Sequence, residues 1–408
     1  MRRRLFVVIA VLTLCLAAAG TAAGGTLSGR YIVVLERGAN AQAVAADHAR
    51  RAGADVLHVY GHAINGYSAH LSPAGLAKVR ADDRVLFVSA DREVRATAQT
   101  LPTGVDRIEG DLSSTASGDG LGSAGAPVAV IDTGIDRDHP DLNVVGGKNC
   151  SNGKSYDDGN GHGTHVAGTI AAKDNAVGVA GMAPGAPLYA VRVLNNNGSG
   201  SWSSVICGID WVTANAASKG IKVANMSLGG SGSDTGCGGD ALHKAICNSV
   251  AAGVTYVVAA GNNAVDLRGF VPAAYDEVLT VTAVADFNGT SGGGAAATCR
   301  SDVDDTAADF SNFTTTGSSD ESHTIAAPGV CIRSSWKGGG YNTISGTSMA
   351  SPHVAGTAAL CISGPCAGLS PAGVIAKLRA DAAAQPADYG FTGASGRSYG
   401  RLVYARGY

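Results

Sequence analysis

The stretch Gly346-Thr347-Ser348-Met349-Ala350-Ser351-Pro352-His353-Val354-Ala355-Gly356 joins a turn of small residues to the start of an apolar helix. Small residues let the backbone turn sharply and approach a ligand, and the apolar run that continues to Cys361 predicts a buried helix. Ser348 would then hold its hydroxyl at a helix N-terminus, where free N–H groups and the helix dipole favour negative charge. This position suits a nucleophile, although a serine there can also be a simple helix cap.

The composition indicates a compact, loop-rich globular protein. Of the 408 residues, 45% are hydrophobic, only 15% are charged and 58 are glycine, which excludes a disordered chain. The formal net charge of −3 selects no partner. Because no basic patch is interleaved with aromatic residues, we expect no nucleic-acid partner.

The N-terminus has the pattern of a secretory signal peptide, which we place at residues 1–24. Three arginines at positions 2–4 precede the apolar run 5–19, and small residues follow it. This run is too short for a comfortable membrane span, so we expect cleavage, export and no membrane anchor. The alternative is a lipid anchor on Cys15, which is disfavoured by Leu14 where a small residue is expected.

Eight cysteines follow the signal segment, and an even number in an exported chain indicates disulfide bonds. Spacing alone does not determine the connectivity. Our predicted pairs are Cys150–Cys207, Cys237–Cys247, Cys299–Cys331 and Cys361–Cys366. A zinc cluster is the competing interpretation, and it is weakened because the chain has no Cys-x-x-Cys pair.

Residues 30–95 are predicted to form a small α+β module. The expected strands are 31–35, 56–60, 64–71 and 85–89, and the expected helices are 41–52 and 74–80. This strand-helix-strand-strand-helix-strand order is the split βαβ arrangement, so we expect a ferredoxin-like fold. The polar stretch 95–125, rich in Gly and Ser, is predicted to be extended and to contain a linker.

Beyond the linker, apolar strands alternate with helices, which predicts a doubly wound α/β domain with a parallel sheet covered on both faces. The expected strands are 127–131, 188–193, 223–226, 255–260 and 278–283, and the expected helices are 162–172, 203–217 and 240–252. Pro371 marks the first turn of a further helix, and a short strand is expected near 402–404. Segment 287–306 is rich in Gly and Asp without a period, which indicates a surface insertion.

Two residues upstream of Ser348 could supply the base that a serine nucleophile needs. Asp132 directly follows an apolar strand, so its carboxylate should lie at the carboxyl edge of the sheet. His162, in Gly161-His162-Gly163-Thr164-His165-Val166-Ala167-Gly168, begins a helix expected to pack on that sheet. It could accept the Ser348 proton through one nitrogen and donate to Asp132 through the other. The alternatives are a turn role for Asp132 and a metal pair of His162 with His165, which lacks a third ligand.

Taken together, three motifs in the order Asp, His, Ser resemble those of the subtilisin-like serine proteases, or subtilases. They are Val130-Ile131-Asp132-Thr133-Gly134, the His162 to Gly168 stretch and the Gly346 to His353 stretch. The resemblance is to the proteinase K-like branch and covers nearly the whole chain. Residues 30–95 are similar to the family's inhibitory propeptide, with Ile64-Asn65-Gly66-Tyr67-Ser68-Ala69 in its second hairpin region, and 98–408 are similar to its catalytic domain.

The resemblance implies a secreted serine endopeptidase that cleaves proteins or peptides through an acyl-enzyme. Asp132 would orient the base, His162 would act as general base and acid, and Ser348 would be the nucleophile. Asn262, in Ala259-Ala260-Gly261-Asn262, would donate to the oxyanion together with the Ser348 N–H, unless it is only a loop cap.

Substrate binding and maturation are implied in the same way. Ser227, Leu228 and Gly229 would pair with an extended peptide as an added strand. Ala259, Ala260 and Gly261 would line the pocket for the side chain before the scissile bond. The propeptide would inhibit its own catalytic domain, with self-cleavage between about Arg95 and Gln99, and we expect a monomer.

The chain also departs from the family pattern. Its cysteines and its 287–306 insertion do not match the proteinase K-like branch, and Thr324 stands where that branch has a calcium-binding aspartate. Hydrolysis would need no cofactor, and no metal ligands are assigned. Structural calcium is an expectation without a position, for which Asp157, Asp158 or the carboxylates from Asp302 to Asp305 could offer oxygens. The rival interpretations are a non-catalytic binding protein that uses the same groove and a metal-dependent hydrolase.

Overall fold

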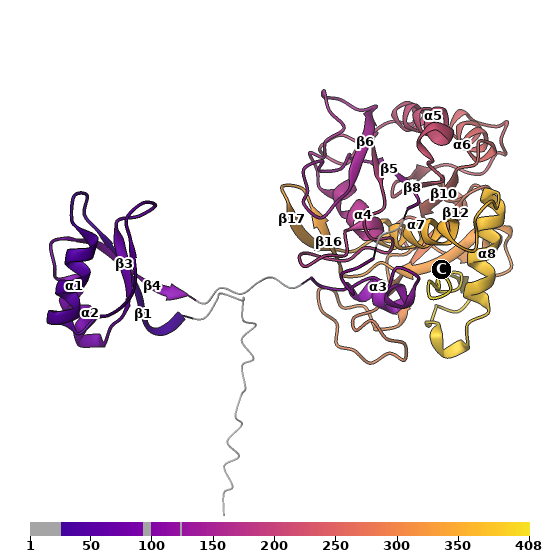
Figure 1. Cartoon of the computed structure of the whole chain (residues 1–408). Coiled ribbons are helices and arrows are strands. Elements are labelled where there is room, and N and C mark those ends of the chain that lie inside the picture. Colours follow the sequence, from indigo (N-terminus) through magenta and orange to yellow (C-terminus); the bar gives the residue numbers. More distant parts are fainter. Residues whose placement is uncertain (1–25, 93–98, 123–124) are drawn as a thin grey trace, which may run out of the picture. The chain divides into compact units, whose positions relative to one another are not determined.

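The computed structural model describes residues 26–92, 99–122 and 125–408 and divides into two compact units between Ala96 and Thr97 (Figure 1). The predicted signal peptide at 1–24 lies outside the described residues, as do positions 95–98 of the predicted cleavage region. Among the helices that are described, none combines the length and the apolar character needed to cross a membrane.

The first unit is a four-stranded sheet with two helices. Its elements are β1 (Thr26–Leu35), α1 (Ala41–Ala52), β2 (Asp55–Tyr60), β3 (Gly66–His70), α2 (Pro73–Arg80) and β4 (Val85–Arg92). The strand order is β2-β3-β1-β4, and every neighbouring pair is antiparallel. This is the split βαβ arrangement, so the ferredoxin-like prediction is confirmed.

The second unit is organised on an eight-stranded sheet in the order β13-β12-β10-β8-β5-β7-β6, with β15 also paired to β12. All pairs are parallel except β12 with β13. The strands are β5 (Val128–Asp132), β6 (Val144–Asn149), β7 (Leu188–Arg192), β8 (Val223–Met226), β10 (Thr255–Ala259), β12 (Leu279–Ala285), β13 (Thr306–Ala307) and β15 (Thr324–Pro328).

Helices cover both faces of this sheet (Figure 1). They are α3 (Thr103–Arg107), α4 (His162–Ala171), α5 (Trp202–Lys219), α6 (Ala241–Ala251), α7 (Thr347–Ser363) and α8 (Pro371–Ala383). Because strand side chains alternate between faces, Val128 and Val130 join the core formed with α4, α7 and α8. Ala129 and Ile131 join the opposite core, formed with α5 and α6. The predicted doubly wound α/β domain is therefore confirmed.

Most of the helices begin at side chains that cap them. The capping side chains belong to Asn40, Ser72, Ser201, Asp240 and Ser370, and each accepts a hydrogen bond from a backbone N–H of the first turn. Pro371 occupies the first turn of α8, as predicted. Helices α4 and α7 differ, because they follow Gly161 and Gly346 and have no side-chain cap. Their first N–H groups are therefore left for other partners.

Shorter elements complete the second unit. They are β9 (Gly230–Ser231), β11 (Phe270–Val271), β14 (Thr314–Thr315), β16 (Ile332–Trp336), β17 (Gly340–Ile344), β18 (Arg397–Ser398) and the 3-10 turns η1 (Gly110–Leu112), η2 (Leu267–Gly269), η3 (Ser319–His323) and η4 (Ala387–Tyr389). The strand expected near 402–404 is wrong, since Leu402 forms only a single bridge with Ala326. The predicted surface insertion 287–306 is mostly exposed and contains no helix or strand before Thr306, which begins β13.

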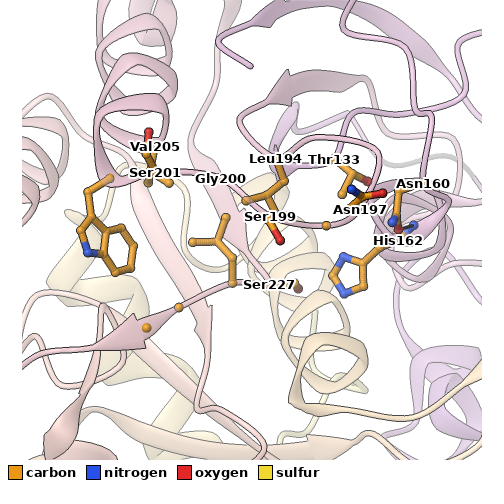
Figure 2. Close-up of a pocket in the computed structure, with 15 residues that line it drawn as sticks. Thr133, Asn160, His162, Leu194, Asn197, Ser199, Gly200, Ser201, Val205 and Ser227 are labelled. Atoms are coloured by element: carbon orange, nitrogen blue, oxygen red, sulfur yellow. Dashed lines mark hydrogen bonds between the residues drawn. The ribbon is translucent and has the colours of Figure 1, made fainter. Parts of the chain in front are cut away.

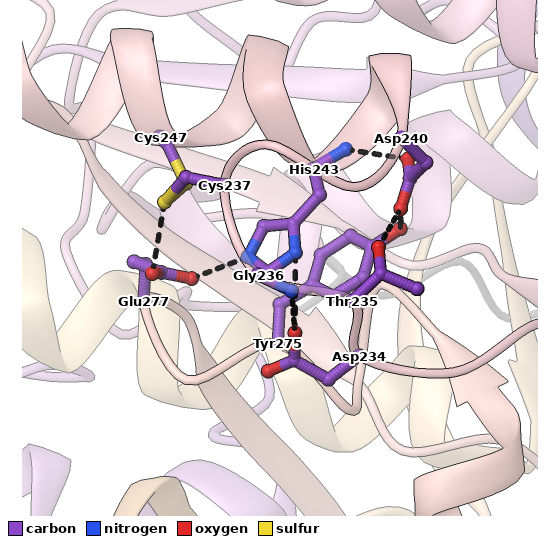
Figure 3. The surroundings of a disulfide bond; sticks show 9 residues. All are labelled: Asp234, Thr235, Gly236, Cys237, Asp240, His243, Cys247, Tyr275 and Glu277. Atoms are coloured by element: carbon purple, nitrogen blue, oxygen red, sulfur yellow. Dashed lines mark hydrogen bonds and ion pairs between the residues drawn. A yellow bond between two sulfur atoms is a disulfide. The ribbon is translucent and has the colours of Figure 1, made fainter.

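All four predicted disulfides are present: Cys150–Cys207, Cys237–Cys247, Cys299–Cys331 and Cys361–Cys366. Figure 3 shows the second of them beside Glu277, whose Oε1 lies 3.2 Å from Cys237 Sγ. The other oxygen of Glu277 lies 2.6 Å from Nε2 of the buried His243, and this imidazole stacks on the ring of Tyr275. The disulfide thus anchors the loop before α6 to the helix that follows it.

The disulfides should differ in how much they stabilise the fold. Cys150–Cys207 spans 57 residues and Cys237–Cys247 spans 10, and chain-entropy estimates give about 4 and about 3 kcal/mol respectively. We expect urea unfolding of the double Cys→Ser variants to show the larger loss of stability for the longer loop. Equal losses of stability, or a larger loss at Cys237–Cys247, would show that contacts in the folded state outweigh the loop-closure entropy of the unfolded chain.

Candidate active site

The buried carboxylate of Asp132 holds His162 at the carboxyl end of β5. Asp132 is the last residue of β5 and is fully buried, and its Oδ1 lies 2.8 Å from His162 Nδ1. The same oxygen accepts from the Thr133 N–H at 2.7 Å. Burial disfavours the charged imidazolium, but the carboxylates of Asp132 and Asp158 outweigh it and raise the pKa of His162 above its ordinary value. This histidine can therefore hold a proton that it receives.

A second buried carboxylate, Asp158, fixes the start of α4. Its Oδ1 accepts from Thr133 Oγ1 and from the Gly161 N–H, both at 2.9 Å. Its Oδ2 accepts from the N–H and the hydroxyl of Thr164 at 3.0 and 2.6 Å. Asp158 thus joins the end of β5 to the helix that carries His162. The sequence reading considered it only as a calcium ligand, although a carboxylate just before a helix is also a signal for an N-terminal anchor.

Ser348 is the second residue of α7 and contacts the strand edge that follows β8. Its Oγ donates to the Ser227 carbonyl at 3.2 Å, and its own carbonyl accepts from Ser227 Oγ at 2.9 Å. Within the described part of the chain, no hydrogen bond joins Ser348 to His162. Catalytic hydrogen bonds are often open in the absence of substrate, so this geometry is compatible with a nucleophile at rest.

A buried hydrogen-bond chain holds α7 against β8. Ser351 Oγ donates to Asn225 Oδ1 at 2.7 Å, and Asn225 Nδ2 donates to Ser227 Oγ at 2.9 Å. All three residues are buried. Since buried polar groups are costly unless they are paired, this chain fixes the helix relative to the strand. Sequence reasoning missed Asn225, because an asparagine inside an apolar strand has no recognisable spacing to its partners.

Asn262 is oriented by the first residue of α7. Its Oδ1 accepts from the Thr347 N–H at 2.8 Å and from Thr347 Oγ1 at 2.9 Å. An N–H can only donate, so the side-chain oxygen must face Thr347 and Nδ2 must face away. A Cβ placed on Gly346 would lie 3.5 Å from Asn262 Nδ2 and 3.6 Å from the Ser348 nitrogen. Both nitrogens therefore lie beside one point next to Gly346, where their N–H groups could donate to the same oxygen.

A pocket of about 830 Å³ lies next to His162 (Figure 2). Ser227, Leu228 and Gly229 line it, so the structure brings three of the predicted substrate-binding residues beside the histidine. Leu194, Trp202 and Val205 give one side an apolar surface. Ala259, Ala260 and Gly261 do not line this pocket. They are buried at the end of β10, directly before Asn262.

His165 is a structural residue in this fold. It is fully buried, its Nε2 contacts the Ile332 carbonyl at 2.9 Å, and burial lowers its pKa to about 3. Two clusters of possible metal ligands occur in the described part of the chain, and neither contains His162 or His165. The metal pair considered from the sequence is therefore not formed.

The carboxylates considered for calcium do not fit that role. Asp158 is saturated by the donors described above, Asp304 accepts from the N–H groups of Phe287 and Ala295, and Asp305 pairs with Arg107. Asp302 pairs with Arg300, and Asp157 faces Arg137. Neither cluster of possible metal ligands among the described residues includes any of these five carboxylates.

Two protein-family models match this chain, one in each of its two units. The peptidase inhibitor I9 family model matches residues 30–97, and the subtilase family model matches residues 123–400. The chain therefore belongs to the subtilase family of serine peptidases, with the subtilisin-like α/β fold and an N-terminal I9 domain.

Several individual proteins are similar to this chain. Subtilisin DY of Bacillus licheniformis is 42% identical over 65% of this chain and 86% of its own length. A thermostable alkaline protease of Halalkalibacterium halodurans is 39% identical over 88% of both chains. The crystal structure of a cold adapted subtilisin-like serine proteinase has 33% identity and a TM-score of 0.56, covering 75% of this chain and 98% of its own.

A methyl group at position 346 should block the space between the two N–H donors. We expect Gly346→Ala to lower peptidase turnover by about 10²–10³-fold, the range for the loss of one oxyanion donor in a subtilisin. Because Gly346 has a φ of +159°, the alanine also strains the backbone, so the unfolding midpoint should fall and turnover is compared where both proteins are folded. Gly236→Ala is the matched control, because Gly236 also has a positive φ and a Cβ there meets nothing within 4 Å. Full turnover in Gly346→Ala would contradict this interpretation of the space.

Proposed function

We propose that this serine peptidase is a secreted endopeptidase that cleaves proteins through an acyl-enzyme on Ser348. The observation that supports this most directly is the 2.8 Å contact of His162 with the buried Asp132, at the wall of a pocket that Ser227 also lines. A base held in one orientation beside a helix N-terminal serine is the arrangement that activates a hydroxyl.

In the proposed reaction, the Ser348 hydroxyl leaves the Ser227 carbonyl and transfers its proton to His162 Nε2 as Oγ attacks the substrate carbonyl carbon. Asp132 stabilises the resulting imidazolium through Nδ1–H. The carbonyl oxygen becomes an oxyanion between the Ser348 N–H and Asn262 Nδ2. His162 then gives its proton to the leaving amine, which breaks the peptide bond. A water molecule, deprotonated by His162, releases the acyl group and restores Ser348.

Substrate would bind as an extended strand along Ser227, Leu228 and Gly229, with backbone hydrogen bonds supplying most of the affinity. The apolar lining formed by Leu194, Trp202 and Val205 favours substrates with apolar side chains before the scissile bond. Ala259, Ala260 and Gly261, which do not line this pocket, would form one wall of a separate pocket for the side chain directly before that bond. Recognition through backbone groups favours unfolded segments and exposed loops over rigid structure.

Maturation follows from the two-part organisation of the chain. In this proposal residues 1–24 direct export, residues 30–95 inhibit the catalytic domain as a propeptide, and residues 98–408 form a monomeric enzyme after self-cleavage. Support comes from the I9 match at 30–97 and from the separate compact unit that ends at Ala96. Within the family we propose the proteinase K-like branch, on the motifs around Asp132, His162 and Ser348.

No cofactor takes part in this mechanism, because the four side chains and the Ser348 backbone N–H named above supply every proton transfer and every stabilising charge. Structural calcium is separate from the chemistry. It would need oxygen ligands other than the carboxylates of Asp157, Asp158, Asp302, Asp304 and Asp305.

The nucleophile can be tested directly. We expect a fluorophosphonate probe to label the wild-type protein at Ser348 and to leave Ser348→Ala unlabelled. Mass spectrometry should find the wild type cleaved between about Arg95 and Gln99 and the variant uncleaved. Labelling without any peptide hydrolysis would favour a binding protein, and loss of hydrolysis on chelation without loss of fold would favour a metal-dependent hydrolase.

The pH dependence tests the pairing of Asp132 with His162. Catalysis needs the neutral imidazole, so kcat/KM rises with pH through the pKa of His162, which the carboxylate raises. Asp132→Asn should move this acid limb to lower pH and reduce turnover by about 10⁴-fold. Asp138→Asn, at an exposed carboxylate, is the control. An unchanged acid limb in Asp132→Asn would show that the two groups are not coupled.

A further inference from the structure

Three side chains that could bind a metal meet at the amino end of the parallel sheet. Asp276 lies in the turn before β12, and Asp320 and His323 lie in η3, directly before β15. The strands β12 and β15 are parallel neighbours, with Thr280 opposite Thr324, so the residues that precede them come together. One ligand atom from each of the three side chains lies within 4.8 Å of the others.

His323 is buried without hydrogen-bond partners. It is 2% exposed, and neither of its ring nitrogens has a partner. Its Nε2 points to Asp276 Oδ1 at 3.7 Å and to Asp320 Oδ1 at 3.8 Å, distances too long for hydrogen bonds. Within the described residues, the two carboxylates make no hydrogen bond either. A buried imidazole without a hydrogen-bond partner is costly. The site therefore favours a bound ion or molecule between the imidazole and the two carboxylates.

The charges around the cluster are those of a cation site. Burial raises the pKa of Asp320, and the nearby carboxylates of Asp266 and Asp276 raise it further by repulsion. Burial also lowers the pKa of His323, with a smaller contribution from the Arg379 guanidinium, against the pull of the two aspartates. Carboxylates therefore lie on the side of the cluster that faces the His323 ring, and their charge attracts a cation between these groups.

We propose that Asp276, Asp320 and His323 bind one divalent transition-metal ion, with zinc as the representative ion. Zinc bonds of about 2.0–2.2 Å to nitrogen and oxygen place tetrahedral ligand atoms about 3.4 Å apart. The observed 3.7 and 3.8 Å spacings need only a small contraction. An imidazole ligand favours zinc over calcium, which takes six to eight oxygens. The Asp276 side chain is 64% exposed, so an ion and a water ligand can enter from solvent.

The bound ion would act as a cross-link and take no part in hydrolysis. It would join the segment between β11 and β12 to the turn before β15. Since β11 pairs with β9, which directly follows Ser227, Leu228 and Gly229, the ion would also brace the chain behind the substrate-binding edge. This inference does not depend on the proposed roles of Asp132, His162 and Ser348.

The test uses the full chain carrying Ser348→Ala, treated with chelator and then titrated with zinc chloride. We expect one zinc ion per chain by calorimetry and a rise of the thermal unfolding midpoint with zinc. Asp276→Asn and Asp320→Asn should each weaken zinc binding by more than about tenfold, since losing even an outer partner of a metal ligand costs 10–100-fold. Asp276 is exposed, so its variant should fold normally.

Two matched controls locate the ion. Asp138→Asn removes an exposed carboxylate that belongs to no ligand cluster, and His243→Gln removes the histidine of the other cluster, shown in Figure 3. Both should bind zinc like the parent. The proposal is overturned if the parent binds no zinc, if Asp276→Asn binds it normally, or if His243→Gln abolishes binding. It is also overturned if calcium alone stabilises the parent and Asp276→Asn removes that effect.

Discussion

The contact between the buried Asp132 carboxylate and His162 is the interaction on which the rest of the catalytic unit depends. A carboxylate without solvent is costly unless it is fully paired. Asp132 is fully buried at the end of an apolar strand, and the Thr133 N–H and His162 both contact its Oδ1, while its Oδ2 has no hydrogen-bond partner among the described residues. Helix α4 must in turn begin at His162, and Asp158 holds it there. One buried charge thus determines the end of a strand and the start of a helix.

Buried hydrogen bonds also fix the helix on the other side of the site. Helix α7 also begins after a glycine without a side-chain cap, and its first N–H groups serve Asn262 and the space beside Gly346. Asn225 and Ser351 connect this helix to β8 through buried hydrogen bonds. The groups that we propose to react therefore lie on two helix N-termini that are tied to neighbouring strands of one sheet. Side chains supported in this way keep their geometry without a loop that must first become ordered.

The fold and the contact of Asp132 with His162 could be predicted because their signals are local. Apolar strands, helix starts and the motifs around Asp132, His162 and Ser348 are each contained in a few consecutive residues. Asn225, Asp158 and the cluster at His323 could not be predicted, since their partners are distant in the chain and no fixed spacing relates them. Likewise, Leu402 forms only one bridge because the segment lies at the sheet edge, where an apolar run does not ensure a strand.

The contact of the Ser348 hydroxyl with the Ser227 carbonyl has a consequence for the idle enzyme. This carbonyl belongs to the strand edge along which an extended peptide would pair, so a substrate N–H that donates to it would share the acceptor with the hydroxyl and weaken its hold. Arrival of a peptide would displace the hydroxyl and leave it free to turn toward His162. A small molecule that offers no N–H to this edge would leave it in place. Binding of a peptide in the groove would then be the same step that frees the Ser348 hydroxyl to react.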